Sequence, residues 1–162
     1  MFEVIRSWFV KILVKVVPFV FRRIYSHEKL VGLINITISS ENGGIVINCS
    51  ELPNAVAWIE ITNLSPVKLK LVGVEAILYW PGRVAEFKKM SRMEISPHSK
   101  KSFCIESSLN ELQVAHVRKN QNKRDNLRLY VELSFESSIR DIEKQEEIQT
   151  TNIRLLNCKG VD

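Results

Sequence analysis

The clearest structural signal in the chain is the stretch LRLYVELSFE, residues 127–136. Its apolar side chains stand at every second position, with charged or polar side chains between most of them. A period of two is typical of a β-strand with one face on a hydrophobic core and the other in solvent. We therefore predict a half-buried strand, with inward-facing Leu129, Val131 and Leu133 and outward-facing Arg128 and Glu132.

Similar runs of alternating residues, separated by turn signals, fill most of the chain after residue 30. The apolar positions change face at Gly73, which predicts a β-bulge. The charged run 83–95 is typical of a strand at the edge of a sheet. Seven or eight short strands with frequent turns predict a mainly β fold, an antiparallel β-sandwich. The strands are expected at 34–39, 45–49, 55–62, 67–80, 83–95, 102–106, 127–135 and 148–156.

One short helix interrupts the strands. Ser108 and Glu111 have the spacing of a capping box, in which a hydroxyl and a carboxylate satisfy backbone N–H groups at the start of a helix. Leu109 and Leu112 continue on one face, so we expect a helix over about 108–118. It would bridge the two sheets at one end of the sandwich.

Residues 2–25 are the most apolar stretch, but basic side chains interrupt it. At 100° per residue, Lys11 and Lys15 fall on one narrow polar stripe, and large apolar side chains cover the opposite side. This pattern predicts an N-terminal amphipathic helix of the kind that lies in a bilayer interface. Residues 1–29 would be a tether and residues 30–162 the sandwich domain. The expected tether contacts are Trp8, Phe9, Lys11, Lys15, Phe19, Arg22 and Arg23.

The charge is concentrated in this segment. The whole chain has a net charge of +5; residues 1–30 carry six basic and two acidic side chains, and the other 132 residues carry 17 and 16. A nucleic-acid-binding domain would hold its charge on the folded body, so a nucleic-acid partner is not expected. A basic tether favours an anionic lipid surface. A second basic cluster falls in an expected loop and is a candidate contact for an anionic surface: Arg118, Lys119, Lys123 and Arg124.

The flanks of the tether predict its orientation. Arg22, Arg23 and Lys29 follow the apolar stretch, whereas only Arg6 precedes it. Basic flanks are retained on the cytoplasmic side, so the sandwich domain should face the cytosol. We expect the tether to lie on the membrane rather than to span it, because Lys11 and Lys15 would each cost about 2.5–3.5 kcal/mol near the bilayer centre. Spanning stays an open alternative.

The three cysteines, Cys49, Cys104 and Cys158, are widely spaced and form no CxxC or zinc motif. We expect free, structural thiols, which agrees with a cytosol-facing domain. One disulfide is the alternative. The three Asn-X-Ser/Thr sequons, at Asn35, Asn48 and Asn63, are expected to remain unmodified.

No pattern of a known chemistry is present. The six glycines form no phosphate-binding loop, and no activated nucleophile or metal-ligand cluster is visible. His116 follows Leu109 and Leu112 at helical spacing, which predicts a partly buried packing residue. We therefore expect no enzyme, no cofactor and no metal, and the sequence identifies no small-molecule substrate.

The segment AWIEITNLSP, residues 57–66, and the strand that follows it up to Leu78 and Tyr79 resemble the late-embryogenesis-abundant (LEA) type 2 domain. In that family an apolar strand ends in an Asn-Pro turn; here Leu64 and Ser65 separate Asn63 from Pro66. Many members carry an N-terminal membrane anchor. The resemblance implies an immunoglobulin-like or fibronectin-like sandwich and a non-catalytic, protective or lipid-associated role.

Together these features predict a non-enzymatic, membrane-associated interaction or scaffold module. The alternative is a soluble assembly subunit whose N-terminal helix packs on a partner protein. In both cases residues 1–25 make the contact.

Overall fold

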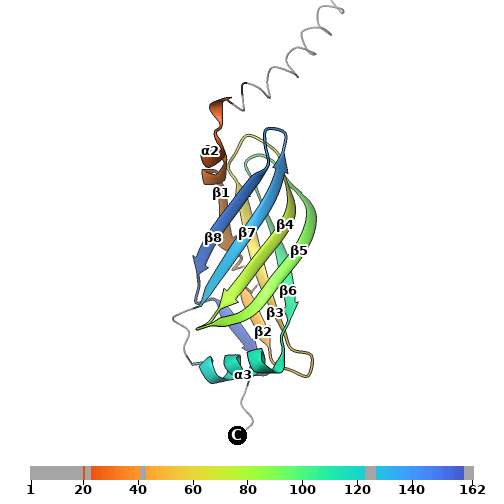
Figure 1. The fold of residues 1–162 in the computed structure, drawn as a ribbon, viewed down its shortest axis with the longest axis vertical. Coiled ribbons are helices and arrows are strands. Elements are labelled where there is room, and N and C mark those ends of the chain that lie inside the picture. Colours follow the sequence, from red (N-terminus) through yellow and green to blue (C-terminus); the bar gives the residue numbers. More distant parts are fainter. Residues whose placement is uncertain (1–19, 21–22, 41–42, 123–126, 159–162) are drawn as a thin grey trace, which may run out of the picture.

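The structure is a computed structural model that describes residues 20, 23–40, 43–122 and 127–158. Within these residues the chain is mainly β, with nine strands in two sheets (Figure 1). The elements are α2 (His27–Gly32), β1 (Ile34–Ile38), β2 (Ile45–Asn48), β3 (Asn54–Asn63), β4 (Leu69–Tyr79), β5 (Arg83–Ile95), β6 (Ser99–Ser108), α3 (Glu111–Asn120), β7 (Arg128–Ser137), β8 (Ile142–Gln149) and β9 (Ile153–Leu156).

The five-stranded sheet is built around β3. Strand β6 pairs with β3 along its whole length, so β1 and β2 must pair in succession with the opposite edge of β3. They form one interrupted strand, and β9 adds to β2 in parallel. The interruption depends on Gly44, whose φ of +67° lies in the left-handed region. A Cβ there would lie 2.7 Å from the backbone oxygen of Asn152.

The four-stranded sheet has the order β5-β4-β7-β8 and is antiparallel throughout. The pairing of β4 with both neighbours shifts register between Leu71 and Gly73, which confirms the bulge expected at Gly73. Strand β5 lies at the edge of this sheet, as its charge predicted. In Figure 1 this sheet lies in front of the five-stranded sheet.

The core fills the space between the two sheets. On β7 the side chains of Leu129, Val131, Leu133 and Phe135 are buried and the residues between them are mostly exposed, which confirms the strand predicted from residues 127–135. Strand β3 contributes an equally regular row of buried side chains, and β4 contributes two such rows that change phase at the bulge. The hydrophobic burial of these rows is the main stabilising term of a sandwich of this kind.

The capping prediction for the helix is wrong by two residues. Ser108 is still paired with Asn54 at the end of β6, so it cannot cap a helix. Asn110 is the N-cap instead. Its side-chain oxygen accepts a hydrogen bond from the Gln113 N–H, and the side-chain oxygen of Gln113 accepts one from the Asn110 N–H. Leu112 lies off the face of α3 that packs on the sandwich and is 82% exposed. The buried face consists of Val114, Val117 and Asn120.

The end of the chain also differs from the prediction. A single strand was expected over 148–156, whereas β8 and β9 are separate and belong to different sheets. Strand β8 is mostly Lys, Glu and Gln, and of its side chains only Ile142 is fully buried. An edge strand with this composition carries little apolar alternation, which explains why the sequence pattern missed it.

The two ends of the sandwich differ. At one end lies α2, whose N-cap Ser26 accepts a bond from the Lys29 N–H and whose Leu30 is fully buried. At the other end lies α3, which bridges the two sheets as predicted (Figure 1). The chain therefore enters the sandwich at the end opposite to α3.

Candidate functional site

A groove with a volume of about 600 Å³ lies on the outer face of the four-stranded sheet. All four strands contribute, because alternate residues of each strand point away from the core. Its floor is Ile77 on β4. The polar and aromatic side chains around it include Glu75 and Tyr79 from β4, Tyr130 and Glu132 from β7, and Lys88 and Glu147 from the two edge strands.

Strand register sets the order of these side chains. One row across the sheet runs Glu86, Ile77, Tyr130 and Glu147, from β5 to β8. The next row runs Lys88, Glu75, Glu132 and Gln145. The first row is therefore apolar and aromatic at its centre, and the second places two carboxylates at its centre.

The aromatic part of the groove is a pair of tyrosines. The rings of Tyr79 and Tyr130 meet edge to face, with centroids 5.8 Å apart. The Tyr130 hydroxyl donates to a carboxylate oxygen of Glu147, and Arg128 donates to the other oxygen at 3.1 Å. The hydrogen bond to Glu147 and its negative charge raise the pKa of Tyr130 above the ordinary value of 10.0.

The carboxylate part of the groove is only partly balanced by cations among the described residues. Glu75 and Glu132 are direct cross-strand partners on β4 and β7, and like charges in this position repel. Glu75 forms an ion pair with Lys88, which raises the pKa of Lys88. Glu132 has no ion-pair or hydrogen-bond partner for its side chain among the residues that the structure describes.

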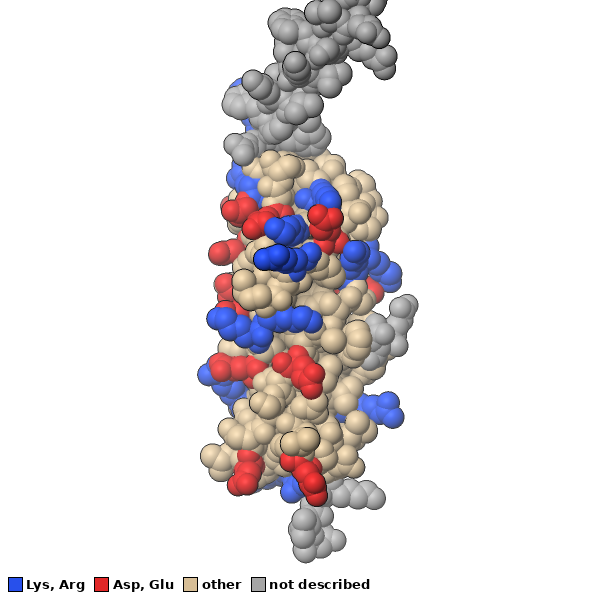
Figure 2. Space-filling view, turned by 90° about the vertical axis from the view of Figure 1, so that its right-hand side faces the viewer, with Lys and Arg blue, Asp and Glu red and all other residues tan. Residues whose placement is uncertain are grey.

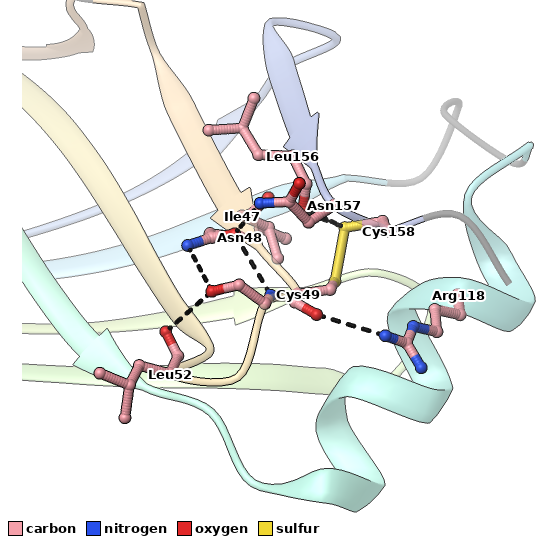
Figure 3. Close-up of a disulfide and its surroundings, with 9 residues drawn as sticks. Ile47, Asn48, Cys49, Leu52, Arg118, Leu156, Asn157 and Cys158 are labelled. Carbon is pink, nitrogen blue, oxygen red and sulfur yellow. Dashed lines mark hydrogen bonds between the residues drawn. A yellow bond between two sulfur atoms is a disulfide. The ribbon is translucent and has the colours of Figure 1, made fainter. Parts of the chain in front are cut away.

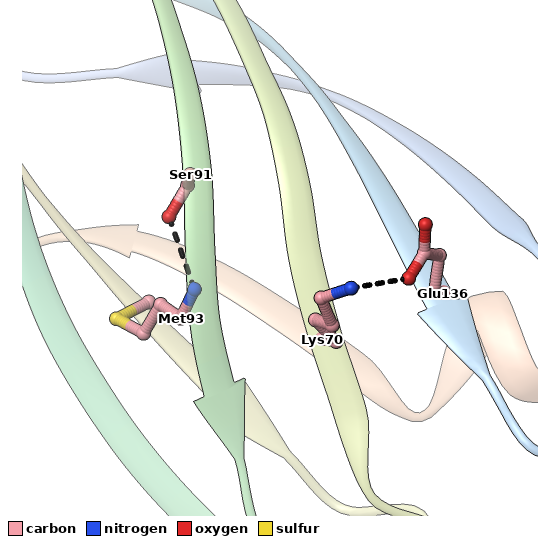
Figure 4. Close-up of polar contacts among 4 residues, drawn as sticks. All are labelled: Lys70, Ser91, Met93 and Glu136. Atoms are coloured by element: carbon pink, nitrogen blue, oxygen red, sulfur yellow. Dashed lines mark hydrogen bonds and ion pairs between the residues drawn. The ribbon is translucent and has the colours of Figure 1, made fainter.

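The other end of the same sheet face is balanced. Lys70 on β4 binds Glu136 on β7 at 2.7 Å, and the two side chains reach across adjacent strands (Figure 4). Nearby, the hydroxyl of Ser91 accepts a bond from the Met93 N–H where the pairing of β5 changes register. Lys68 pairs with Glu94, which lowers the pKa of that carboxyl below its usual range.

Helix α3 holds the β4–β5 turn beside the groove. The His116 Nε2 lies 2.8 Å from the carbonyl oxygen of Trp80 and 2.6 Å from that of Pro81. Carbonyl oxygens only accept, so Nε2 carries the proton. His116 is partly buried, as predicted, and Trp80 is fully buried beneath it. The contact fixes the end of β4 that carries Tyr79.

The cysteine prediction is wrong for two of the three residues. Cys49 and Cys158 form a disulfide with a Cα–Cα distance of 4.9 Å, and Cys104 is free (Figure 3). The two cysteines follow β2 and β9, which pair in parallel, so their Cα atoms come within bonding range. They are 109 residues apart in the sequence, and sequence spacing alone did not indicate this pairing.

The predicted anionic-surface cluster is only partly described. Arg118 and Lys119 lie in the last turn of α3 rather than in a loop. The Arg118 Nη2 donates to the carbonyl oxygen of Cys49 at 3.2 Å, so its guanidinium turns toward the disulfide (Figure 3). Lys119 is exposed. Lys123 and Arg124 lie outside the described residues.

Of the predicted tether contacts, only Arg23 is described, and it is exposed. Its apolar neighbours Val20 and Ile24 are 43% and 54% exposed. Tyr25 packs partly against the core. The remaining predicted contacts lie outside the described residues: Trp8, Phe9, Lys11, Lys15, Phe19 and Arg22.

The three sequons have different surroundings. Asn63 is fully buried: it donates to the carbonyl oxygens of Val67 and Ser96 at 2.8 and 3.1 Å, and it accepts from Ser65. It organises the turn between β3 and β4 and is closed to modification in the folded domain. Asn35 on β1 is exposed, and Asn48 binds Ser50.

The side formed by β5 and β6 carries many charges of both signs. Figure 2 shows basic and acidic side chains alternating down this side. Lys88 and Lys100 form ion pairs with Glu75 and Glu60, and Lys89 donates to the Cys104 carbonyl oxygen at 2.8 Å. This arrangement is typical of a solvated sheet edge rather than of a basic binding patch.

Within the described residues, no three His, Cys, Asp or Glu side chains are grouped so that they could hold a metal ion. No helix in the described part of the chain has the length and apolar character needed to cross a bilayer.

No protein-family model matches the sequence, and no curated protein matches it. A target of the Northeast Structural Genomics Consortium is 14% identical, and the alignment covers 72% of this chain and 84% of the other at a TM-score of 0.49. A protein from Archaeoglobus fulgidus is 16% identical over 72% and 94%, with a TM-score of 0.41. A protein provisionally assigned to the LEA proteins is 14% identical over 91% and 86%, with a TM-score of 0.38. Similarity at this level assigns no family and no function.

Proposed function

We propose that this protein is a non-enzymatic, membrane-associated interaction module. Residues 1–25 bind a lipid surface as an amphipathic helix, and the sandwich presents its outer sheet face to a partner. The observation that carries the proposal is the exposure of Val20, Arg23 and Ile24 next to the domain. Apolar and basic side chains that the domain leaves uncovered are suited to an anionic bilayer interface.

Burial supports a separate tether. Among the described residues the first buried core residue is Leu30, and the core rows of both sheets are filled from residues that follow it. Among the described residues before α2, Tyr25 packs partly against the core. The domain therefore has a closed core next to a segment with uncovered apolar side chains.

We further propose an immunoglobulin-like sandwich related to the LEA type 2 domain. The strand order supports this type, because β6 lies beside β3 and β7 beside β4, as the Greek-key connections of that fold require. The turn organised by Asn63 at the end of β3 supports the relation to the LEA family, since it uses the residues that carry the resemblance.

We propose that the domain faces the cytosol, and the support is the basic flank of Arg22, Arg23 and Lys29. The cysteines no longer support this orientation, because disulfides are rare in the cytosol and persist in oxidising compartments. A protease added outside intact cells tests it. Loss of the domain from the intact cells would place the domain outside and overturn the orientation.

Liposome flotation tests the tether. The full chain should float with vesicles that contain anionic phosphatidylglycerol, and a form without residues 1–22, which keeps α2 and its cap, should stay at the bottom. Lys11→Glu with Lys15→Glu should weaken flotation, as should raised salt. Resistance to alkaline carbonate extraction would identify a spanning segment. Recovery of both forms in the lipid-free fraction would refute the membrane role and favour the soluble assembly subunit.

A further inference from the structure

We propose that the groove on the outer face of the four-stranded sheet binds a short, extended peptide segment of a partner protein that carries arginine or lysine. The proposal rests on the role of the protein as an interaction module and names the chemistry of its partner. One basic side chain lies over the Tyr130 ring and bonds to the Glu132 carboxylate. The apolar part of the segment rests on Ile77.

The charge of the groove selects a cation. Glu75 and Glu132 face each other across β4 and β7, and Glu132 has no partner for its side chain among the described residues. The only ion pair of Glu75 within the same residues is with Lys88, which is 77% exposed. A basic group placed between the two carboxylates relieves their repulsion and forms charge-assisted hydrogen bonds.

The aromatic part of the groove favours the same ligand. Tyr130 is 46% exposed, and its hydroxyl is already bonded to Glu147. Its ring lies one outward-facing position before Glu132 on β7, so a guanidinium can stack on the ring and reach the carboxylate at the same time. Cations within about 6 Å of such a ring are attracted by its electron-rich face, and arginine makes these contacts more often than lysine.

The size of the groove limits the ligand to a short segment. Four strands spaced about 4.8 Å apart give a width of about 14 Å, which equals about four extended residues. A volume of about 600 Å³ lies within the usual range of ligand sites. The groove takes a short segment rather than a folded surface.

The acidic character of the groove excludes an anionic lipid headgroup as its ligand. The N-terminal segment of this chain does have basic and aromatic side chains. However, the groove lies next to the β4–β5 turn, at the α3 end of the sandwich, and the chain enters at the α2 end (Figure 1). A partner segment is therefore the occupant that fits best.

Fluorescence anisotropy with the full chain tests the proposal. The probe is a fluorescein-labelled peptide, Gly-Arg-Val-Arg-Val-Arg-Gly, and its control has glutamine in place of each arginine. The arginine peptide should bind at least tenfold more tightly than the control at low salt. Glu132→Gln should weaken its binding about five- to tenfold. Glu136→Gln removes the same charge from the same face of β7, but at the balanced end, and should change binding less than twofold.

Three results would overturn the proposal: equal binding of both peptides, equal losses from Glu132→Gln and Glu136→Gln, or no binding to a protein whose melting curve shows that it is folded. Lys11→Glu with Lys15→Glu adds a fourth. If that variant binds the peptide more than threefold more tightly, the chain's own segment occupies the groove. Flotation without peptide tests the tether separately, so failure of one assay leaves the other interpretable.

Discussion

Val131 and Glu132 are neighbours on β7, but their side chains lie on opposite faces of the sheet. Val131 is 2% exposed and packs between the sheets, whereas Glu132 is exposed at the centre of the groove. The inner face is apolar along the whole strand. The outer face changes along the strand, from the unbalanced Glu132 to Glu136, which is paired with Lys70. The inner face maintains the fold, and the outer face is free to carry binding chemistry.

The largest expected effect is on the inner face. Val131→Asp places a charge without a partner between the sheets, and such a change costs more than about 4 kcal/mol. We expect the variant to be unfolded at room temperature, as measured by circular dichroism. A folded Val131→Asp protein would show that the two faces of β7 have been assigned the wrong way round.

The disulfide is the next largest contribution. Replacing Cys158 by Ser opens a loop of 109 residues. The chain-entropy account of cross-links gives a loss of about 4.8 kcal/mol for a loop of this length, and disulfides typically contribute about 2–4 kcal/mol. Urea unfolding of the oxidised protein and of Cys158→Ser measures it. Cys104→Ser is the matched control and should change the unfolding free energy by less than about 1 kcal/mol, because Cys104 is a free thiol outside the main core. Equal effects would show that the pairing is wrong.

The third largest loss of stability is expected when the side chain of Asn63 is removed from the turn between β3 and β4. Asn63→Ala leaves the carbonyl oxygens of Val67 and Ser96 without this donor and removes the acceptor of Ser65. The expected cost is about 2–3 kcal/mol in urea unfolding. Asn35→Ala changes the same residue type on the exposed face of β1 and should cost less than about 0.5 kcal/mol. Similar costs would mean that the buried network does not stabilise the turn.

On the outer face, the contribution of Tyr130 to stability should depend on pH, because it depends on the ionisation of the hydroxyl group. Its pKa is raised in the folded state, mainly by the hydrogen bond to Glu147. The stabilisation is therefore fully present below the ordinary pKa of 10.0 and is lost as the pH rises through the folded pKa. In absorbance titrations at 295 nm, the difference between the protein and Tyr130→Phe reports this group. Glu147→Gln should lower the titration midpoint of Tyr130. An unchanged midpoint would show that the hydrogen bond to Glu147 does not raise the pKa of Tyr130.

The smallest effect should come from Arg128→Ala. Arg128 is half-exposed, and its ion pair with Glu147 is open to solvent. We expect the free energy of unfolding to change by less than about 0.5 kcal/mol. A loss close to that of Val131→Asp would contradict the difference between the two faces.

Much of the fold could be predicted from the sequence, because alternation is a local property of each strand. The strand at 127–135, the edge position of 83–95 and the bulge at Gly73 follow from residues that are close in the chain. The limits of this reasoning appear at β8, where an edge strand has few apolar side chains. They appear again at α3, where Ser108 was already committed to β6.

The candidate groove was not predicted. Outward-facing glutamates and tyrosines could be found on single strands, but their meaning depends on which strands are neighbours. Glu75 meets Glu132 and Tyr79 meets Tyr130 only because β4 pairs with β7 in one register. Each side chain on its own had the ordinary appearance of a solvated strand residue.

The sequence by itself determined which residues face inward, where most strands lie and how charge is divided between the tether and the domain. These properties depend on the period of two and on composition, and neither requires knowledge of distant contacts. Only the tertiary structure decided the disulfide partner, the role of Asn63 and the groove. All three depend on backbone segments that meet after folding, when β2 pairs with β9, β3 turns into β4, and β4 lies beside β7.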